Sequence, residues 1–202
     1  MANAELMQNE DTPENDRIKY AGNILGVTYQ MRTLVENMLE MARIDNGTAK
    51  IEFAEVDFSQ LVSDAVLSFQ LLYEEKQMGL QCSAPEGIMV KGSEQHLYQV
   101  MDVLLDNALK YSVPKSTVRV DLVNYGRTCL LSIISPGDPL SREDLKNIFK
   151  RFYRADKARS MNGSYGLGLS IAESVVTSHG GKIWAESGAD YNKFTVQLPT
   201  IQ

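Results

Sequence analysis

The sequence DVLLDNALKYS, residues 102–112, decides the fold together with GSYGLGLSIAESVV, residues 163–176. Over residues 94–111, which include the first of these stretches, apolar residues recur at helical spacing and predict a half-buried helix. Asn107 and Lys110 emerge near the end of this helix. An amide oxygen is a suitable ligand for Mg²⁺, and a lysine ammonium attracts phosphate as a point charge. The same residues also occur as plain helix decoration, with Lys110 favoured by the helix dipole, so this stretch alone leaves both interpretations open.

The second stretch places Gly163, Gly166 and Gly168 at the start of another helix, which is expected to begin near Leu167. Glycines let backbone N–H groups approach an anion closely, and the helix points its positive dipole end at the same place. The chain has no G-x-x-x-x-G-K-[ST] motif, and no acidic residue follows at the distance that a dinucleotide-binding fold needs. The glycines therefore predict a phosphate site outside those two folds.

Three segments, in this order, resemble the N, F and G2 boxes of sensor histidine kinases. They are NALKYS, EDLKNIFKRFYRADKARS (residues 143–160) and GSYGLGLSIAESVVTSHGGKIWAESG (residues 163–188). The ATP-binding domain of those kinases belongs to the wider gyrase and MutL superfamily. The resemblance implies an α+β fold, a two-layer α/β sandwich of the Bergerat type, in which helices cover a mixed sheet. It also implies that a long bundle helix precedes this sandwich.

The resemblance implies a protein-histidine kinase of a two-component system, with ATP and Mg²⁺ as cofactors. Such an enzyme transfers the γ-phosphoryl group of Mg-ATP to a histidine and then to an aspartate of a response-regulator receiver domain. In the family, the asparagine at Asn107 ligates Mg²⁺, and the lysine and tyrosine at Lys110 and Tyr111 line the nucleotide. The whole implied site consists of Asn107, Lys110, Tyr111, Ser135, Gly137, Arg154, Lys157, Gly166, Leu167 and Gly168.

The phosphate half of the implied site contains basic residues and a glycine lid. The family's arginine at Arg154 and lysine at Lys157 lie by the phosphates, and Gly166 and Gly168 hold a mobile lid over them. Residues 142–160 contain seven Lys or Arg against three Asp or Glu, a local charge of +4 in a chain with net charge −6. A cationic segment beside a glycine lid suits a polyanionic ligand, although a solvated amphipathic helix has the same composition.

The base-binding box departs from the family. Histidine kinases usually carry D-x-G-x-G, whereas this chain has Ser135 at the aspartate, Gly137 at the first glycine and Pro139 at the second. A serine hydroxyl can accept a hydrogen bond from adenine, but it gives a weaker one than a carboxylate. We therefore expect reduced affinity and reduced selectivity for adenine.

The position of the superfamily's water-activating carboxylate, four residues before Asn107, holds Val103. An apolar side chain cannot act as a general base, and Asp102 is rotated by about 100° around the helix. Efficient ATP hydrolysis is therefore not expected. Phosphoryl transfer to another nucleophile is compatible with this site because it depends mainly on positioning and charge neutralisation.

The chain contains two histidines, His96 and His179, and neither has the context of a phosphoacceptor. His96 follows the expected N-cap Ser93, and His179 is expected in the last turn of the helix that begins with the glycines. We therefore expect the acceptor histidine to lie outside this chain, and the sequence to be a piece of a longer kinase that cannot autophosphorylate.

The N-terminal region predicts a helix over about residues 13–45, with Thr12 as its N-cap and Pro13 at its first position. Asn46-Gly47 ends it. Residues 1–47 are expected to be the remnant of a dimerisation and phosphotransfer hairpin, and residues 48–202 the ATP-binding domain. The apolar positions of the helix over residues 13–45 follow heptad spacing, which indicates homodimerisation through a helical bundle. The alternative is an amphipathic helix that packs on its own domain. The heptad positions are Tyr20, Ile24, Val27, Met31, Leu34, Met38 and Met41.

The remaining elements are predicted from caps and alternation. Asp57 caps a helix over roughly residues 58–77, with Gln60 closing a capping box, and Ser141 with Asp144 starts another helix. Strands are expected near residues 50–55, 79–84 and 88–91, in a hairpin over 118–126 and 129–135, and over 182–187 and 193–198.

Composition limits the function further. A pI near 5.0, with no basic face outside residues 142–160, argues against nucleic-acid binding. Cys82 and Cys129 lie in apolar, strand-like contexts, which favours reduced, buried thiols in a cytoplasmic domain. No apolar run of eighteen residues exists, so this segment predicts no membrane contact, and only the resemblance suggests a membrane-anchored parent.

Two alternatives accompany the kinase interpretation. The first is a degenerate module that binds nucleotide weakly or not at all and signals by conformation, because Ser135, Pro139 and Val103 depart from the family. The second is a serine kinase or an ATPase of the same superfamily. The helix expected over residues 13–45 argues against the second, because those relatives lack the bundle hairpin.

Overall fold

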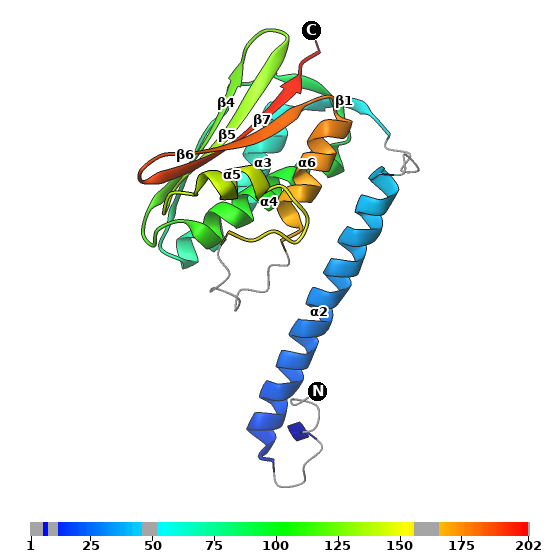
Figure 1. Cartoon of the computed structure of the whole chain (residues 1–202), viewed down its shortest axis with the longest axis vertical. Helices are drawn as coiled ribbons and strands as arrows, with labels where there is room; N and C mark the ends of the chain where they lie inside the picture. Colours follow the sequence, from blue (N-terminus) through cyan, green and yellow to red (C-terminus); the bar gives the residue numbers. More distant parts are fainter. Residues whose placement is uncertain (1–5, 8–11, 46–51, 156–165, 202) are drawn as a thin grey trace.

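A five-stranded mixed sheet forms one layer of the molecule (Figure 1). Its strands follow the order β2 (Gly79–Ser83), β4 (Thr117–Asn124), β5 (Thr128–Pro136), β7 (Tyr191–Pro199) and β6 (Lys182–Ser187). β2 pairs with β4 in parallel, and all other neighbours are antiparallel. The computed structural model describes residues 6–7, 12–45, 52–155 and 166–201.

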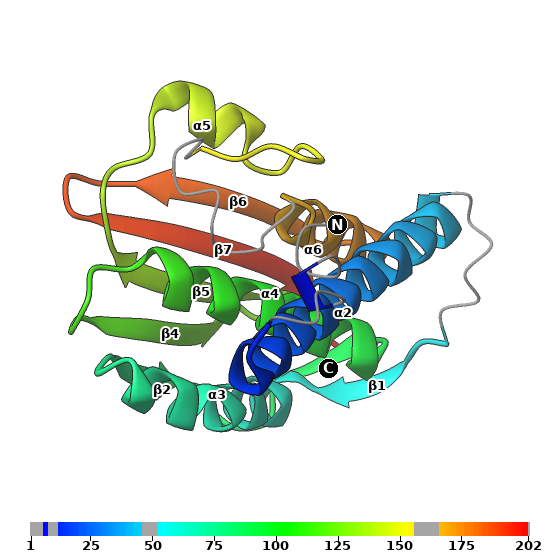
Figure 2. The same ribbon diagram turned by 90° about the horizontal axis from the view of Figure 1, so that it is seen from below.

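Three helices cover one face of this sheet and form the second layer (Figure 2). They are α3 (Phe58–Glu75), α4 (Glu94–Tyr111) and α6 (Gly168–Ser178). The predicted two-layer sandwich is confirmed, and the bounds of α4 match the helix predicted over residues 94–111. The hairpin of β4 and β5 and the last two strands also lie where alternation predicted them.

The core lies between the two layers and follows from the alternation of β5 and β7. Ile133 pairs with Phe194 and Leu131 with Val196, so these buried side chains share the face that the helices cover. From the opposite side, α4 contributes one apolar face. Its buried residues are Leu97, Val100, Met101, Leu104, Leu105, Ala108 and Leu109.

Two short strands lie outside the main sheet. β1 (Ala54–Asp57) and β3 (Met89–Gly92) form an antiparallel pair of their own, close to the predicted strand positions. The end of the chain joins this pair, because the N–H of Ile201 donates to the carbonyl of Met89 at 2.9 Å. β3 leads directly into α4, so this small sheet holds the start of that helix.

The predicted helix caps are partly confirmed. The carboxylate of Asp57 accepts from the N–H of Gln60 at 3.0 Å, as predicted for the start of α3. The prediction that Gln60 closes a capping box is wrong, because its amide donates to Asp64 at 2.8 Å instead. The helix α5 (Arg142–Asn147) begins with the complete Ser141 and Asp144 capping box that the sequence predicted.

The helix α2 (Glu14–Asp45) extends away from the sandwich (Figure 1) and packs against α6. It begins one residue later than predicted, because the carbonyl of Pro13 accepts from the N–H of Arg17, while the hydroxyl of Thr12 donates to Leu6. Several apolar side chains of α2 are exposed: Ile18, Leu25, Val27, Met31, Val35, Met38 and Leu39. The side chains of Leu34 and Met41, two of the predicted heptad positions, are not among those described.

Within the described residues, none of the helices is both long and apolar enough to cross a membrane.

The two cysteines differ in environment. Cys129 is fully buried in β5, and burial raises the pKa of its thiol to about 11. Cys82 is exposed, so the prediction that both thiols are buried is wrong for this residue. The reason is that β2 is an edge strand in which only Leu80 is buried.

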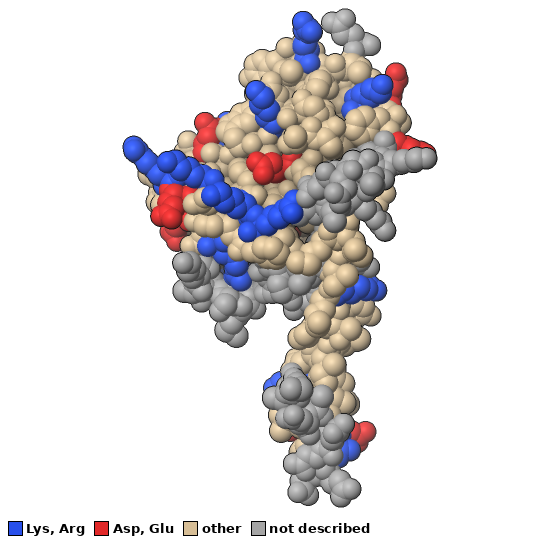
Figure 3. All heavy atoms as spheres, turned by 45° about the vertical axis from the view of Figure 1, so that its right-hand side comes forward, with Lys and Arg blue, Asp and Glu red and all other residues tan. Residues whose placement is uncertain are grey.

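The segment that begins with α5 is basic. Its described part, residues 142–155, contains five Lys or Arg against two Asp or Glu, a net charge of +3. α5 lies close to β6, at one edge of the sheet (Figure 2). On the face shown in Figure 3, Lys and Arg side chains form a band across the globular part of the molecule.

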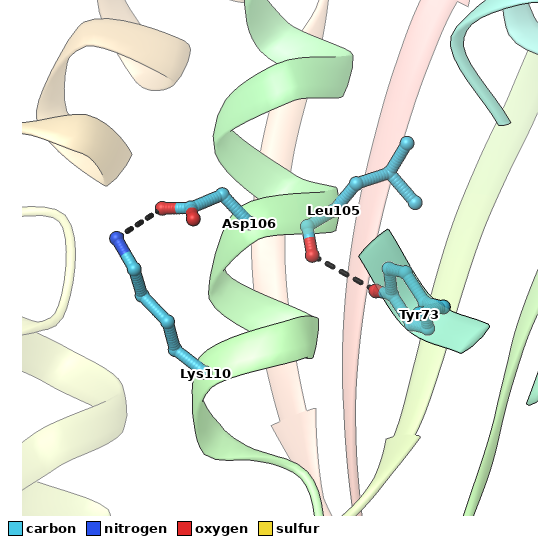
Figure 4. Close-up of polar contacts among 4 residues, drawn as sticks. All are labelled: Tyr73, Leu105, Asp106 and Lys110. Atoms are coloured by element: carbon cyan, nitrogen blue, oxygen red, sulfur yellow. Dashed lines mark hydrogen bonds and ion pairs between the residues drawn. The ribbon is translucent and has the colours of Figure 1, made fainter. Parts of the chain in front are cut away.

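A buried hydrogen bond ties α3 to α4. The hydroxyl of Tyr73, which has no exposed surface, donates to the carbonyl of Leu105 at 2.9 Å (Figure 4). Burial, with a contribution from the charge of Asp106, holds the pKa of Tyr73 well above its usual value, so this phenol remains a donor throughout the physiological pH range.

We predict that Tyr73→Phe lowers the free energy of unfolding by about 1 kcal/mol, the usual net value of such a hydrogen bond. For a domain of this size, this corresponds to a fall in Tm of about 2–4 °C in thermal denaturation followed by circular dichroism. The matched control is Tyr98→Phe, because the hydroxyl of Tyr98 donates to Ser68 at an exposed position. An equal fall in Tm in both variants would show that the buried hydrogen bond stabilises the fold no more than the exposed one.

Candidate functional site

The C-terminal half of α4 carries the first three predicted site residues. Asn107 and Lys110 are half-buried, and Tyr111 is exposed. The ammonium of Lys110 pairs with the carboxylate of Asp106, with Nζ and Oδ2 2.5 Å apart (Figure 4). Asp106 was missed in the sequence, although its i,i+4 spacing to Lys110 indicates this contact. The pair therefore links the residues one before and three after Asn107 on α4.

The start of α6 packs on α4 one turn before Asn107. A Cβ atom added to Gly168 would lie 3.2 Å from the Cγ1 atom of Val103, so the two helices touch at this point. The N-cap residue Leu167 supplies no side-chain hydrogen bond, and the first turn of α6 contains no acidic residue. The N–H groups of this turn are therefore suited to an anion. The fold thus brings the two opening stretches of the sequence together.

The segment around Tyr153 lies against the glycine turn. Gly166 has φ +69°, and a Cβ atom there would lie 2.6 Å from the carbonyl oxygen of Tyr153, so glycine is required. The N–H of Phe152 also donates to the carbonyl of Gly166 at 2.9 Å. Arg154, which is half-buried, follows directly and so lies beside this turn. Lys157 and Gly163 lie outside the described residues.

The end of β5 lies beside the end of α4. The N–H of Val113 donates to the carbonyl of Pro136 at 2.9 Å, and a Cβ atom on Gly137 would lie 3.2 Å from the carbonyl oxygen of Tyr111. Ser135 is buried, and its hydroxyl donates to the carbonyl of Asn192 at 3.4 Å. The structure therefore places Gly137, two residues after Ser135, against the end of α4 at Tyr111.

Asn192 on β7 organises the loop that follows Ser135. Its amide nitrogen donates to the carbonyl of Asp138 at 2.9 Å, and its amide oxygen accepts from the hydroxyl of Ser187 at 2.7 Å. Ser187 in turn accepts from the N–H of Leu140 at 2.8 Å. Asn192 was not among the predicted site residues. Alternation along β7 could have found it, because a polar residue there stands in register with inward-facing apolar ones.

Val103 and Asp102 point in different directions. Val103 packs against Gly168, whereas Asp102 lines a separate groove with Tyr98 and Gln99 on another face of α4. Because Asp102 is about 140° around the helix from Asn107, its carboxylate does not share the face of that amide. Asp102 therefore does not take the place of Val103.

The side chains around Asn107 would supply only part of the coordination sphere of Mg²⁺. In the part of the chain that the structure describes, no group of three or more His, Cys, Asp or Glu side chains could hold a metal ion. Asn107 contributes one amide oxygen here, and the carboxylate of Asp106, the preceding residue, pairs with Lys110. Mg²⁺ keeps several waters and takes one or two protein groups plus substrate phosphates, so this sparse set suits it.

Both histidines make contacts at Ser93, the N-cap residue of α4. Nδ1 of His96 and the hydroxyl of Ser93 lie 2.8 Å apart. Ser93 occupies the N-cap position as predicted, although its hydroxyl makes no cap bond to the helix. His179, the C-cap residue of α6, is buried, and its Nε2 accepts from the N–H of Ser93 at 3.0 Å. Both ring nitrogens of His179 are thus engaged within the fold.

Comparison with known proteins identifies the family. Residues 92–202 match the family described as histidine kinase-, DNA gyrase B- and HSP90-like ATPases. The sensor protein DltS of Streptococcus agalactiae serotype V is 31% identical over 198 residues, which cover 98% of this chain and 49% of that protein. The chain thus spans about half the length of this curated relative.

Solved structures share the fold. Full-length ShkA in complex with AMPPNP superposes with a TM-score of 0.78 at 19% identity, covering 98% of this chain and 41% of that one. Histidine kinase ThkA in complex with response regulator protein TrrA gives 0.77 at 22% identity, covering 98% and 55%. The chain therefore belongs to the family of histidine kinase-, DNA gyrase B- and HSP90-like ATPases, and it contains the ATPase catalytic domain of a sensor histidine kinase.

Proposed function

We propose that this chain holds Mg-ATP for transfer of its γ-phosphoryl group to a histidine, and from there to an aspartate of a response-regulator receiver domain. One observation carries this proposal. The end of α4 with Asn107, the start of α6 with Gly168 and the basic segment ending at Arg154 converge on one place. A metal-binding amide, an anion-binding helix end and cationic side chains are the parts that a nucleotide triphosphate requires.

Each residue would contribute a distinct interaction. Asn107 would hold Mg²⁺, which neutralises charge on the phosphates when it is bound. Lys110 and Arg154 would attract phosphate oxygens, and the N–H groups after Gly168 would donate to them. Lys110 pairs with Asp106 in the described state, so a phosphate would replace that carboxylate as its partner. Lys157 is proposed to lie beside Arg154 on the basis of the resemblance.

The acceptor histidine is proposed to be neither His96 nor His179. Both ring nitrogens of His179 are engaged inside the fold, and His96 sits at the start of α4, about eleven residues and 16 Å along the helix from Asn107. Val103 leaves the site without a general base for water. We therefore propose phosphoryl transfer to an external histidine rather than steady-state hydrolysis.

The partners follow from the same assignment. The solved complex of ThkA with response regulator TrrA supports a receiver domain as the partner. The exposed apolar residues of α2, including Val27, Met31 and Met38, support a homodimer through a helical hairpin that contains residues 1–47. Residues 48–202 are proposed to be the ATP-binding domain. Because ATP is the proposed substrate, we place this activity in the cytoplasm.

We predict that isothermal titration calorimetry with Mg²⁺ and a non-hydrolysable ATP analogue detects one binding site. Asn107→Ala should weaken binding at least tenfold, about 1.4 kcal/mol or more, because a metal ligand is lost. Gln70→Ala, which removes an amide from the exposed face of α3, should leave binding unchanged. Binding that is absent in the unsubstituted chain would favour the degenerate signalling module.

Base selectivity should be weaker than with a carboxylate at position 135. A hydroxyl both donates and accepts, so it tolerates the 6-oxo group of guanine as well as the 6-amino group of adenine. In a competition titration, the affinity for the ATP analogue should exceed that for the GTP analogue only slightly. Ser135→Asp should increase this preference for adenine. Ser132→Asp, on the other face of β5, should not. The same adenine preference before and after Ser135→Asp would show that this residue does not contact the base.

The full-length protein, given labelled ATP, should form a phosphoprotein that is labile in acid and stable in base. Added receiver domain should remove the label, because a phosphohistidine donates its phosphoryl group to aspartate. The Asn107→Ala protein should remain unlabelled. Sustained release of inorganic phosphate without a labelled protein would contradict the kinase and favour the ATPase alternative.

A further inference from the structure

The helices α4 and α6 run antiparallel and touch near both ends of α6. At one end, Gly168 meets the side chain of Val103. At the other end, Nε2 of His179 accepts the backbone N–H of Ser93. The first contact lies beside the proposed phosphate site, and the second lies at the far end of the helix pair.

The two contacts match in length. From Ser93 to Val103 the helix rises about 15 Å, and from Gly168 to His179 about 16 Å, at 1.5 Å per residue. Because the two spans between these contacts are nearly equal, the pair of contacts fixes one axial register of α6 on α4. Without the contact at Ser93, apolar packing alone would determine that register, and packing permits sliding more readily than a directional hydrogen bond does.

The ring of His179 is held in one tautomer. Its Nδ1 lies 2.7 Å from the carbonyl oxygen of Val175, which only accepts, so Nδ1 carries the proton and Nε2 is the acceptor for Ser93. Burial lowers the pKa of His179, with a further contribution from His96, and both effects favour the neutral ring that this acceptor role needs.

The residues around the His179 ring allow it to approach Ser93 closely. A Cβ atom on Gly92 would lie 2.5 Å from the His179 ring, so the residue before Ser93 has to be glycine. The ring also packs on Phe53, with ring centroids 4.8 Å apart. Phe53 lies just before β1, where the chain enters the sandwich after α2. The imidazole thus joins α6, the start of α4 and the chain that leads from α2.

We propose that His179 is a positioning residue of the nucleotide site, which sets the register of α6 on α4 through Ser93 and thereby fixes Gly168 relative to Asn107. This role rests on the proposed function, because it concerns the same Mg-ATP site. It adds a residue that determines the geometry of the site from the opposite end of the helix pair, far from the phosphates. His179 therefore acts through α4 and α6 and does not touch the nucleotide.

The test uses two substitutions at each partner. His179→Gln keeps an acceptor at about the reach of Nε2, whereas His179→Asn is too short to reach Ser93. Ser93→Pro deletes the donating N–H, and the φ of −96° at Ser93 lies within about 30° of the proline value. Ser93→Ala keeps that N–H and removes only the hydroxyl that faces His96.

The readout is the affinity of the chain for Mg²⁺ with a non-hydrolysable ATP analogue, measured by calorimetry where every variant is folded. We expect His179→Asn and Ser93→Pro each to weaken binding about fivefold or more, the usual scale of coupling between sites. His179→Gln and Ser93→Ala should bind like the unsubstituted chain. Because the two losses share one hydrogen bond, the double variant should lose no more than either alone.

The outcomes separate this role from a purely structural one. If all four variants lower Tm but bind the analogue equally, His179 only stabilises the fold and the proposal is overturned. If Ser93→Pro alone retains full affinity, the contact with Ser93 is not the route, and the proposal is again overturned. If the unsubstituted chain does not bind the analogue, the proposed function fails, and the positioning role fails with it.

Discussion

The site depends on one steric constraint, the direct contact between α6 and α4 at Gly168 and Val103. A Cβ atom at Gly168 would lie 3.2 Å from Cγ1 of Val103, so even this one atom would require the valine or the helix end to shift by a few tenths of an ångström. The apolar side chain at Val103 makes this contact and also removes the place of a general base. On the proposed function, the same packing would build the phosphate site and disfavour hydrolysis there. A catalytic domain that passes a phosphoryl group to a protein side chain needs both properties.

The base-binding half depends on a different kind of constraint. Ser135, Gly137 and the loop after them are held by Asn192, which lies directly across from Ser135 in the paired strands. Because the amide of Asn192 is engaged on both its nitrogen and its oxygen, the network shapes the loop. This part of the domain is neutral where its relatives usually carry a carboxylate, which accounts for the weaker base selectivity that we propose. The phosphate half keeps its charge.

The sequence predicted the elements whose determinants are local. Apolar periodicity located α4, alternation located the strands, and the side chains of Asp57 and Ser141 capped their helices as expected. Contacts between distant residues could not be predicted in this way. Ser93 and His179 are 86 residues apart, and Ser135 and Asn192 are 57 apart. Choices between equivalent local partners were also not predictable: the amide of Gln60 reaches Asp64 instead of the helix start.

The central claim is that α4 and α6 together form one metal-nucleotide site. Replacing Mg²⁺ by paramagnetic Mn²⁺, which prefers the same oxygen ligands, and adding an ATP analogue would test it by NMR. The account predicts that the backbone signals of Asn107 and Gly168 broaden together, because both lie close to the metal. Signals of the hairpin around Tyr125, at the other end of the sheet, should remain sharp. Broadening that is confined to one of the two helices, or that occurs equally throughout the domain, would contradict the account.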